Sequence, residues 1–353
     1  MHILLIRFSS MGDVVLQTAT VNWLRALFGE NLRITFVTSK EFSSLIESHP
    51  GINEVISFDR RNGDSWRSFT KKIGEIDNSH PFDLILDLHG TLRSFRLRLS
   101  LWKIPALSVD KRRWERFFLT KVKGKWLKRF ISSRMGNEGQ VKRIINDFEA
   151  LFNDHKGIRR TIEKVSGASG ELTSLPRVQK NVLNENYIVL APSASFESKR
   201  WSVDRFVELA EKIIQQDFLT VIVLAGPDDH FCEAFNKINS PQLKNLQGKT
   251  SLKESMSILS GASFCIGNDS GMNHIAEAFG VPCLTLFGPT DPCFGFSPHG
   301  KFSGYISKEL WCKPCSTTGS KKCFREEHFC MQKISVEEVY NHFNSLRQKC
   351  LVG

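Results

Sequence analysis

The stretch from residue 266 to residue 292, IGNDSGMNHIAEAFGVPCLTLFGPTDP, constrains the fold of this chain more than any other. Its residues predict a strand end, a tight turn, a short helix over Met272–Phe279 and a second apolar strand over Val281–Phe287. Gly280 is the helix stop expected between the helix and the second strand. A strand, a helix and a strand in this order are typical of a parallel sheet covered by helices.

The same alternation recurs on both sides of a polar, irregular segment at residues 153–186. Further strands are predicted at residues 2–7, 32–38, 55–58, 83–88, 187–190 and 218–224. A chain of 353 residues also exceeds one usual hydrophobic core. We therefore predict two doubly wound α/β domains, residues 1–180 and 186–334, facing each other across a cleft. The last amphipathic helix, within residues 335–353, is expected to pack back on the first domain.

Composition argues against secreted and membrane-spanning proteins. No segment approaches the roughly 18–20 apolar residues of a membrane span, and the apolar opening of the chain is too short for a signal peptide. Nine cysteines, an odd number, do not suggest a secreted disulfide framework. We therefore expect a cytoplasmic protein.

Positive charge is concentrated in one part of the sequence. Between Arg93 and Arg129 there are thirteen Lys and Arg residues against Asp110 and Glu115, a surplus that equals the net charge of +11 of the whole chain. Aromatic residues are interleaved with this charge: Phe95, Trp102, Trp114, Phe117, Phe118, Trp126 and Phe130. Such a segment suits an anionic membrane surface, an anionic acceptor or nucleic acid, or it is a solvated basic surface.

Loops that follow strands of the second domain carry groups suited to a nucleotide diphosphate. They include Ser193, Ser195, Lys199, Asp229 and the turn Asp269–His274. Ligands of open α/β sheets bind beyond the carboxyl ends of the strands, so these groups should converge.

Within the turn, Ser270 and His274 are four residues apart, on one helix face beside free backbone amides, which is a phosphate-binding arrangement. Lys199 would neutralise a leaving diphosphate, and Asp229 would accept hydrogen bonds from ribose hydroxyls. The alternative for Ser270 and His274 is a capped helix with a structural histidine. The alternative for Lys199 is an exposed loop lysine, and the alternative for Asp229 is a helix cap.

Asp13 occupies the equivalent place in the first domain, after Gly12 at the start of a predicted helix. A carboxylate there can deprotonate an acceptor hydroxyl during attack on a sugar carbon. The alternative role for Asp13 is that of a helix cap.

Three motifs in combination resemble the lipopolysaccharide heptosyltransferases of glycosyltransferase family 9. The motifs are Arg7…Gly12-Asp13, then Ser195…Lys199-Arg200-Trp201, then Asp269-Ser270-Gly271…His274…Gly288-Pro289-Thr290. The resemblance runs from Met1 to the last helix and is weakest between residues 93 and 186. It implies two Rossmann-like domains of the GT-B type. It also implies an inverting transfer of heptose from ADP-heptose to the inner core of lipopolysaccharide.

The resemblance assigns roles residue by residue. Asp13 would be the general base, and Lys199 and Ser195 would contact the diphosphate. Four residues would contact the donor: Asp269, Ser270, Gly271 and His274. Asp229 falls where the family has an acidic residue near the nucleoside, although this chain offers Asp rather than the longer Glu. No metal cofactor is expected, because Lys199, His274 and the helix dipole take its part.

The acceptor that the resemblance implies is an anionic, phosphorylated glycolipid at the cytoplasmic face of the inner membrane, which the protein would contact peripherally. The basic, aromatic-bearing segment would then hold this acceptor. Arg60 and Arg61, in a polar loop after a strand, would reach the same acceptor, or they lie in a solvated loop.

Four cysteines in the pattern Cys312-x2-Cys315-x7-Cys323-x6-Cys330 have spacing that could bind zinc, although the second pair lacks the CxxC spacing. We favour a structural loop of reduced cysteines. Two other functions remain open. One is a transferase or epimerase of the same fold acting on another sugar nucleotide. The other is a basic nucleic-acid-binding protein with a zinc loop formed by the four cysteines. No recognisable nucleic-acid motif supports the latter, so nucleic acid is not an expected partner.

Overall fold

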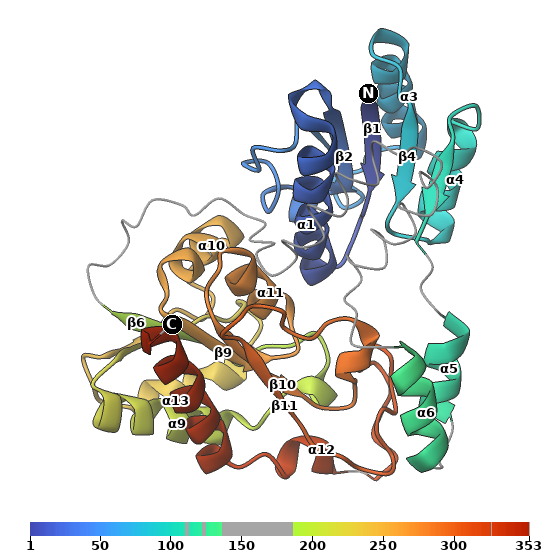
Figure 1. Cartoon of the computed structure of the whole chain (residues 1–353). Coiled ribbons are helices and arrows are strands. Elements are labelled where there is room, and N and C mark those ends of the chain that lie inside the picture. The colour runs from blue at the N-terminus through green and yellow to red at the C-terminus, as the bar shows by residue number, and fades with distance from the viewer. Residues whose placement is uncertain (110–112, 122–124, 136–185, 326, 353) are drawn as a thin grey trace. The chain divides into compact units, whose positions relative to one another are not determined.

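The computed structural model describes residues 1–109, 113–121, 125–135, 186–325 and 327–352 (Figure 1). The described residues divide into two compact units, one of residues 1–109 and one of residues 113–135 and 186–352. The predicted linker and the domain boundary at residues 180–186 lie almost wholly outside the described residues.

The first unit is built on a five-stranded parallel sheet, which confirms the predicted α/β fold. Its strands, in spatial order, are β3 (Glu54–Phe58), β2 (Arg33–Ser39), β1 (His2–Ile6), β4 (Leu84–Asp87) and β5 (Ala106–Ser108). Its helices are α1 (Met11–Phe28), the 3-10 turn η1 (Gly29–Asn31), α2 (Lys40–Ser43), α3 (Trp66–Ser79) and α4 (Leu92–Ser100). All five residues of β1 are buried because β1 lies between β2 and β4, with Leu5 beside Phe36 and Leu86.

The second unit is built on a six-stranded parallel sheet. Its strands, in spatial order, are β11 (Gly304–Ser307), β10 (Cys283–Phe287), β9 (Phe264–Asn268), β6 (Tyr187–Ala191), β7 (Thr220–Val223) and β8 (Leu243–Asn245). Its main helices are α9 (Val203–Asp217), α10 (Leu252–Gly261), α11 (Gly271–Ala278) and α13 (Val336–Val352). Shorter ones are α12 (Phe329–Gln332) and the 3-10 turns η2 (Glu197–Lys199), η3 (His230–Lys237) and η4 (Pro292–Phe294).

Three short strands at sheet edges, β5, β8 and β11, were not predicted from the sequence. Their residues are partly exposed, so they lack the apolar run that marks the buried central strands. In both sheets the strand order reverses beside the first strand of the unit, between β1 and β4 and between β6 and β9. These reversals are the switch points at which doubly wound sheets bind ligands.

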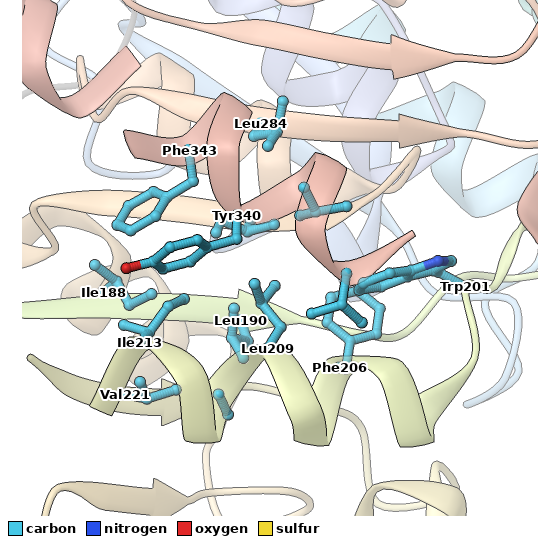
Figure 2. Packing of buried hydrophobic residues seen from close by; sticks show 14 of the residues in the cluster. Ile188, Leu190, Trp201, Phe206, Leu209, Ile213, Val221, Leu284, Tyr340 and Phe343 are labelled. Carbon is cyan, nitrogen blue, oxygen red and sulfur yellow. The ribbon is translucent and has the colours of Figure 1, made fainter. Parts of the chain in front are cut away.

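The C-terminal helix α13 packs in the second unit, which differs from the expectation that residues 335–353 lie on the first domain. Tyr340 and Phe343 of α13 join the core formed by β6 and α9, where Figure 2 shows Tyr340 beside Ile213 and Phe343 next to Tyr340. The Tyr340 hydroxyl also donates to Asp217 at the end of α9, at 3.0 Å. Because the apolar stripe of α13 matches this core, the helix stays with the sheet that precedes it in the sequence.

Part of the basic stretch also belongs to the second unit rather than to the first domain. It forms helices α5 (Arg113–Lys121) and α6 (Lys125–Met135), which pack against η4. Leu119 is buried with Cys293 and Phe294, and Ile131 packs against the same cluster. The charge pattern of this stretch does not encode these long-range apolar contacts, so the sequence did not indicate them. None of the helices in the described part of the chain is long and apolar enough to cross a membrane.

Candidate active site

The predicted donor residues lie where the second sheet reverses its strand order. The loop after β6 carries Ser193, Ser195 and Lys199, and the turn after β9 carries Asp269 and Ser270. Because β6 and β9 are neighbouring parallel strands, their carboxyl ends leave the sheet at the same edge.

Lys199 is held by a buried ion pair. Its Nζ lies 2.7 Å from Oδ2 of Asp269, and the side chains of Lys199 and Asp269 are only 13% and 6% exposed. The same oxygen of Asp269 accepts a hydrogen bond from the Thr290 hydroxyl at 2.8 Å. Asp269 thus acts on Lys199 directly, a role that its assignment as a donor contact did not include.

A glycine far along the chain packs against the stem of Lys199. Gly319 has a φ of +90°, and a Cβ at this position would lie 2.6 Å from Cγ and Cδ of Lys199. The Gly319 carbonyl accepts a hydrogen bond from Ser198 at 2.6 Å, and its amide donates to Ser316 at 2.9 Å. Gly319 lies within the cysteine-containing loop, where the sequence offered no signal for a role at the site.

Ser270 stands at the N-terminus of α11 with its hydroxyl buried. Among the described residues, its Oγ has no hydrogen-bond partner, and it does not cap the helix. A buried polar atom without a partner calls for an explanation, and an oxyanion bound at the helix N-terminus would supply one. Gly271 is the first residue of this helix. His274 follows on the same helix, is buried and lies near Phe296, with ring centroids 6.1 Å apart.

Asn273, which was not among the predicted site residues, fixes α11 to the sheet. Its Nδ2 donates to Thr285 Oγ1 of β10 at 2.8 Å and to the Gly267 carbonyl of β9 at 3.2 Å. A Cβ on Gly267 would lie 2.7 Å from Oδ1 of Asn273. The glycine of the IGND sequence is therefore needed for close approach between helix and strand.

Ser193 and Asp229 meet directly. The Ser193 hydroxyl donates to Oδ2 of Asp229 at 2.6 Å, and the Gly226 amide donates to the same oxygen at 2.9 Å. Arg200 Nη2 lies 3.8 Å from Oδ1, and its guanidinium stands 4.7 Å above the ring of Phe231. The sequence motif contained Arg200 but predicted neither contact.

Ser195 is exposed in the same loop as Ser193, and among the described residues no hydrogen bond or ion pair ties it to the groups above.

In the first unit, Asp13 lies beside the switch point between β1 and β4. Its Oδ1 is 2.5 Å from Nη2 of Arg7, and Ser10 donates to its Oδ2 from the backbone amide at 3.1 Å and from the hydroxyl at 2.8 Å. Burial raises the pKa of Asp13, but the charge of Arg7 and the two bonds from Ser10 outweigh it and hold the pKa below its ordinary value. Asp13 also completes the capping box of α1, so both roles considered for it are compatible with its position.

Arg7 connects the ends of the two central strands, because it also donates to the Leu88 carbonyl after β4. Asp87, the last residue of β4, accepts from the amides of His89 and Gly90 at 3.0 and 2.8 Å. The His89 ring packs edge-on to Phe8, with centroids 5.7 Å apart. The sequence DLHG after a buried strand was a signal for this turn, although none of its residues was among the predicted site residues.

Arg60 and Arg61 lie in an exposed turn closed by Asp59, whose Oδ1 accepts from the Arg61 amide at 3.1 Å. Arg61 Nη2 is 3.2 Å from Oε2 of Glu41, but the Arg61 side chain is 87% exposed. Such an exposed pair contributes little stability, so it would exchange readily for another anion.

The four clustered cysteines are free thiols of intermediate exposure: Cys312, Cys315, Cys323 and Cys330. Burial raises the pKa of Cys330 to about 11. Within the described ranges, no three or more His, Cys, Asp or Glu residues are grouped in a way that could hold a metal ion. Lys313 anchors this loop to the sheet by donating to the Phe287 carbonyl at the end of β10, at 3.1 Å.

Comparison with known proteins adds to this geometry. The family model described as glycosyltransferase family 9 (heptosyltransferase) matches residues 66–324. Lipopolysaccharide heptosyltransferase 1 of Pseudomonas aeruginosa is 24% identical, with 98% of each chain covered.

Two solved structures share the fold over almost the whole chain. A family 9 glycosyltransferase from Veillonella parvula has 18% identity and a TM-score of 0.71, with 99% of this chain and 97% of that chain covered. The Escherichia coli heptosyltransferase WaaC with ADP has 16% identity and a TM-score of 0.65, with 98% and 100% covered.

Proposed function

The chain belongs to glycosyltransferase family 9, the heptosyltransferases, and on this premise we propose that it transfers a heptose from ADP-heptose to the inner core of lipopolysaccharide. The near full-length similarity to a lipopolysaccharide heptosyltransferase supports this acceptor class. The shared fold with a heptosyltransferase solved with ADP supports the nucleotide.

The observation that carries the proposal is the buried, unpartnered Ser270 hydroxyl at the N-terminus of α11, within the part of the chain that the structure describes. In the proposal this hydroxyl and the helix amides bind the diphosphate of the donor. Lys199 pairs with Asp269, the residue directly before Ser270, so the cation is tied to the same turn. Lys199 then neutralises the charge that develops on ADP as it leaves, and the proposal requires no metal cofactor. His274 and Gly271 complete the donor contacts.

The nucleoside end of the donor is assigned to Asp229 and its neighbours. Ser193 and the Gly226 amide orient Oδ2 of Asp229, which leaves Oδ1 to accept a ribose hydroxyl. Arg200 stands above Phe231 beside this carboxylate. Ser195, exposed in the adjoining loop, contributes a hydroxyl to the diphosphate.

Asp13 is proposed as the general base. It accepts the proton of the acceptor hydroxyl while the acceptor oxygen attacks the anomeric carbon of the heptose, and the bond from that carbon to the diphosphate breaks with inversion. With a pKa below its ordinary value, Asp13 is ionised at neutral pH, as a base must be. The ion pair with Arg7 weakens its basicity, so Arg7 tunes this group as well as orienting it.

The acceptor side of the proposal places the enzyme at the cytoplasmic face of the inner membrane, where a phosphorylated glycolipid core is exposed. Arg60 and Arg61 are proposed to contact its anionic groups, because both lie in an exposed turn and the ion pair of Arg61 with Glu41 is open to solvent.

The test is transfer from ADP-heptose to a heptose-free lipopolysaccharide core, followed by mass spectrometry. Wild type is expected to add one heptose, and Asp13→Asn is expected to bind ADP normally while turnover falls at least about hundredfold. Asp83→Asn is the matched control, because Asp83 is a half-exposed carboxylate directly before β4, at the amino ends of the parallel strands, whereas Asp13 follows the carboxyl end of β1. Donor binding without transfer by the wild type would contradict the proposed acceptor or sugar, and equal turnover of Asp13→Asn and Asp83→Asn would contradict the base.

A further inference from the structure

Helices α5 and α6 carry large apolar side chains that are exposed to solvent. In α5, Trp114, Phe117 and Phe118 are 74%, 49% and 52% exposed, and in α6, Trp126 and Phe130 are 78% and 47% exposed. A contiguous group of this many exposed aromatic residues is more often an interaction surface than an ordinary solvated helix face.

These aromatic residues do not lie on the face that packs against the rest of the unit. The packed face of α5 carries Leu119, which is buried, and Arg116, whose Nη2 donates to the Phe294 carbonyl at 2.9 Å. In α6 that face carries Ile131 and Lys128, whose buried Nζ donates to the carbonyls of Trp311 and Lys313 at 3.0 and 2.9 Å. Each helix therefore has one attached face and a separate aromatic face.

The exposed residues follow helical spacing. Positions 114, 117 and 118 of α5, and positions 126, 127 and 130 of α6, recur at intervals that place each set on one side of its helix. Trp126 and Phe130 stack with centroids 6.0 Å apart and an interplanar angle of 13°. Each helix thus presents a continuous apolar stripe, in the manner of helices that lie in a membrane interface.

The charge of this segment identifies the surface that it fits. Residues 113–135 contain eight Lys and Arg residues, of which Arg116 and Lys128 anchor the packed faces, against a single acidic residue, Glu115. Lys121 is exposed, with its Nζ 5.8 Å from the ring centroid of Phe117. Basic charge around an exposed aromatic stripe complements a surface that is anionic on the outside and apolar beneath. No helix among the described residues spans a membrane, so such contact would be interfacial.

We infer that the aromatic faces of α5 and α6 dock the second unit onto the surface of an anionic phospholipid bilayer. The inference rests on the proposed function in placing the enzyme at a membrane, and it adds the surface that makes the contact. It also assigns this part of the basic stretch to the bilayer rather than to the saccharide acceptor. The surface is carried by the unit proposed to bind the donor, since α5 and α6 pack against η4.

The experiment measures sedimentation of the full-length protein with phosphatidylglycerol-containing vesicles and with pure phosphatidylcholine vesicles, without any sugar donor. Wild type is expected to bind the anionic vesicles, to bind them less as salt rises, and to bind the neutral vesicles weakly. The double variant Trp114→Ala/Trp126→Ala is expected to lose affinity by about tenfold or more, because two indole rings no longer enter the interface.

The matched control is Trp102→Ala. Trp102 is 75% exposed and lies next to a lysine whose Nζ is 5.8 Å from its ring, but it is outside α5 and α6. Circular dichroism and ADP binding verify that each variant is folded. An equal loss in the control and the double variant, or no loss in the double variant, would overturn the inference.

Two further readouts distinguish the bilayer from a saccharide ligand and from a surface that is covered. If an excess of isolated core oligosaccharide displaced the protein from anionic vesicles, the surface would bind the saccharide and the bilayer assignment would be wrong. If acrylamide quenched the tryptophans of wild type and of the double variant equally in the absence of vesicles, another part of the chain would cover this surface, and the inference would again fail. Vesicle binding without heptose transfer would leave the docking surface standing and refute the proposed function.

Discussion

Replacing Asp269 with asparagine tests how strongly the fold holds Lys199 in place. The two side chains form an ion pair of 2.7 Å, and Asp269 also accepts a hydrogen bond from Thr290 at 2.8 Å. Asparagine keeps the shape and one acceptor oxygen, so the bond from Thr290 survives. The charge opposite Lys199 is lost.

The expected cost follows from burial. A hydrogen bond to a charged group contributes about 1.5–3 kcal/mol, and removal of one partner of a fully buried ion pair costs about 3–5 kcal/mol. Lys199 is 13% exposed, so water reaches part of it. We therefore expect Asp269→Asn to lower the free energy of unfolding by about 1.5–3 kcal/mol, the lower of the two ranges.

The assay is a double-mutant cycle of Lys199→Met and Asp269→Asn by urea denaturation. Lys199→Met removes the lysine charge, so the further loss of the Asp269 carboxylate leaves no buried cation without a partner. The double variant should therefore be more stable than the sum of the two single effects predicts, by at least about 1 kcal/mol. Lys308 and Glu338 are the control pair, since they lie 2.6 Å apart but their side chains are 29% and 28% exposed. Their coupling should be about 0.2–1 kcal/mol. Equal coupling in the two pairs would refute the argument that burial strengthens the hold on Lys199.

Three further predictions concern single residues. Ser270→Ala should leave the free energy of unfolding unchanged or slightly raised, because the buried hydroxyl has no partner among the described residues. The affinity for ADP, measured by calorimetry, should fall about tenfold. An unchanged affinity would contradict the place of Ser270 at the diphosphate. Gly319→Ala should destabilise the protein by about 1–3 kcal/mol in urea denaturation, because φ is +90° and the new Cβ meets Lys199. Gly63→Ala is the control: φ is +85° and no atom lies within 4 Å of the new Cβ, so its destabilisation measures the cost of the backbone conformation alone. Asp13→Asn should lose stability relative to wild type by a constant amount at neutral pH. The pKa of Asp13 lies below its ordinary value of 3.8, so its contribution is complete above about pH 5. The contribution starts to fall below about pH 4 and is lost as the pH falls through the lower pKa of the folded state. A difference that persists undiminished far below the pKa of Asp13 would count against this.

The sequence by itself determined the class of fold and predicted which loops would meet. Buried strands and amphipathic helices are set by short-range periodicity, and the turn Asp269–His274 lies within one local motif. Because the carboxyl ends of parallel strands share one edge, the loops after β6 and β9 were expected to meet, and they do. The direct bond between Ser193 and Asp229 confirms that the loops carrying them meet, as predicted.

Only the tertiary structure decided which distant surfaces pair. Lys199 meets Asp269 and Gly319, which lie 70 and 120 positions further along the chain, and no local pattern links them. The placement of α13 on α9, and of α5 and α6 on η4, likewise differs from what residue order suggested. Local periodicity tells which face of a helix is apolar, but the partner of that face depends on shape and volume complementarity across the whole core, which sequence spacing does not encode.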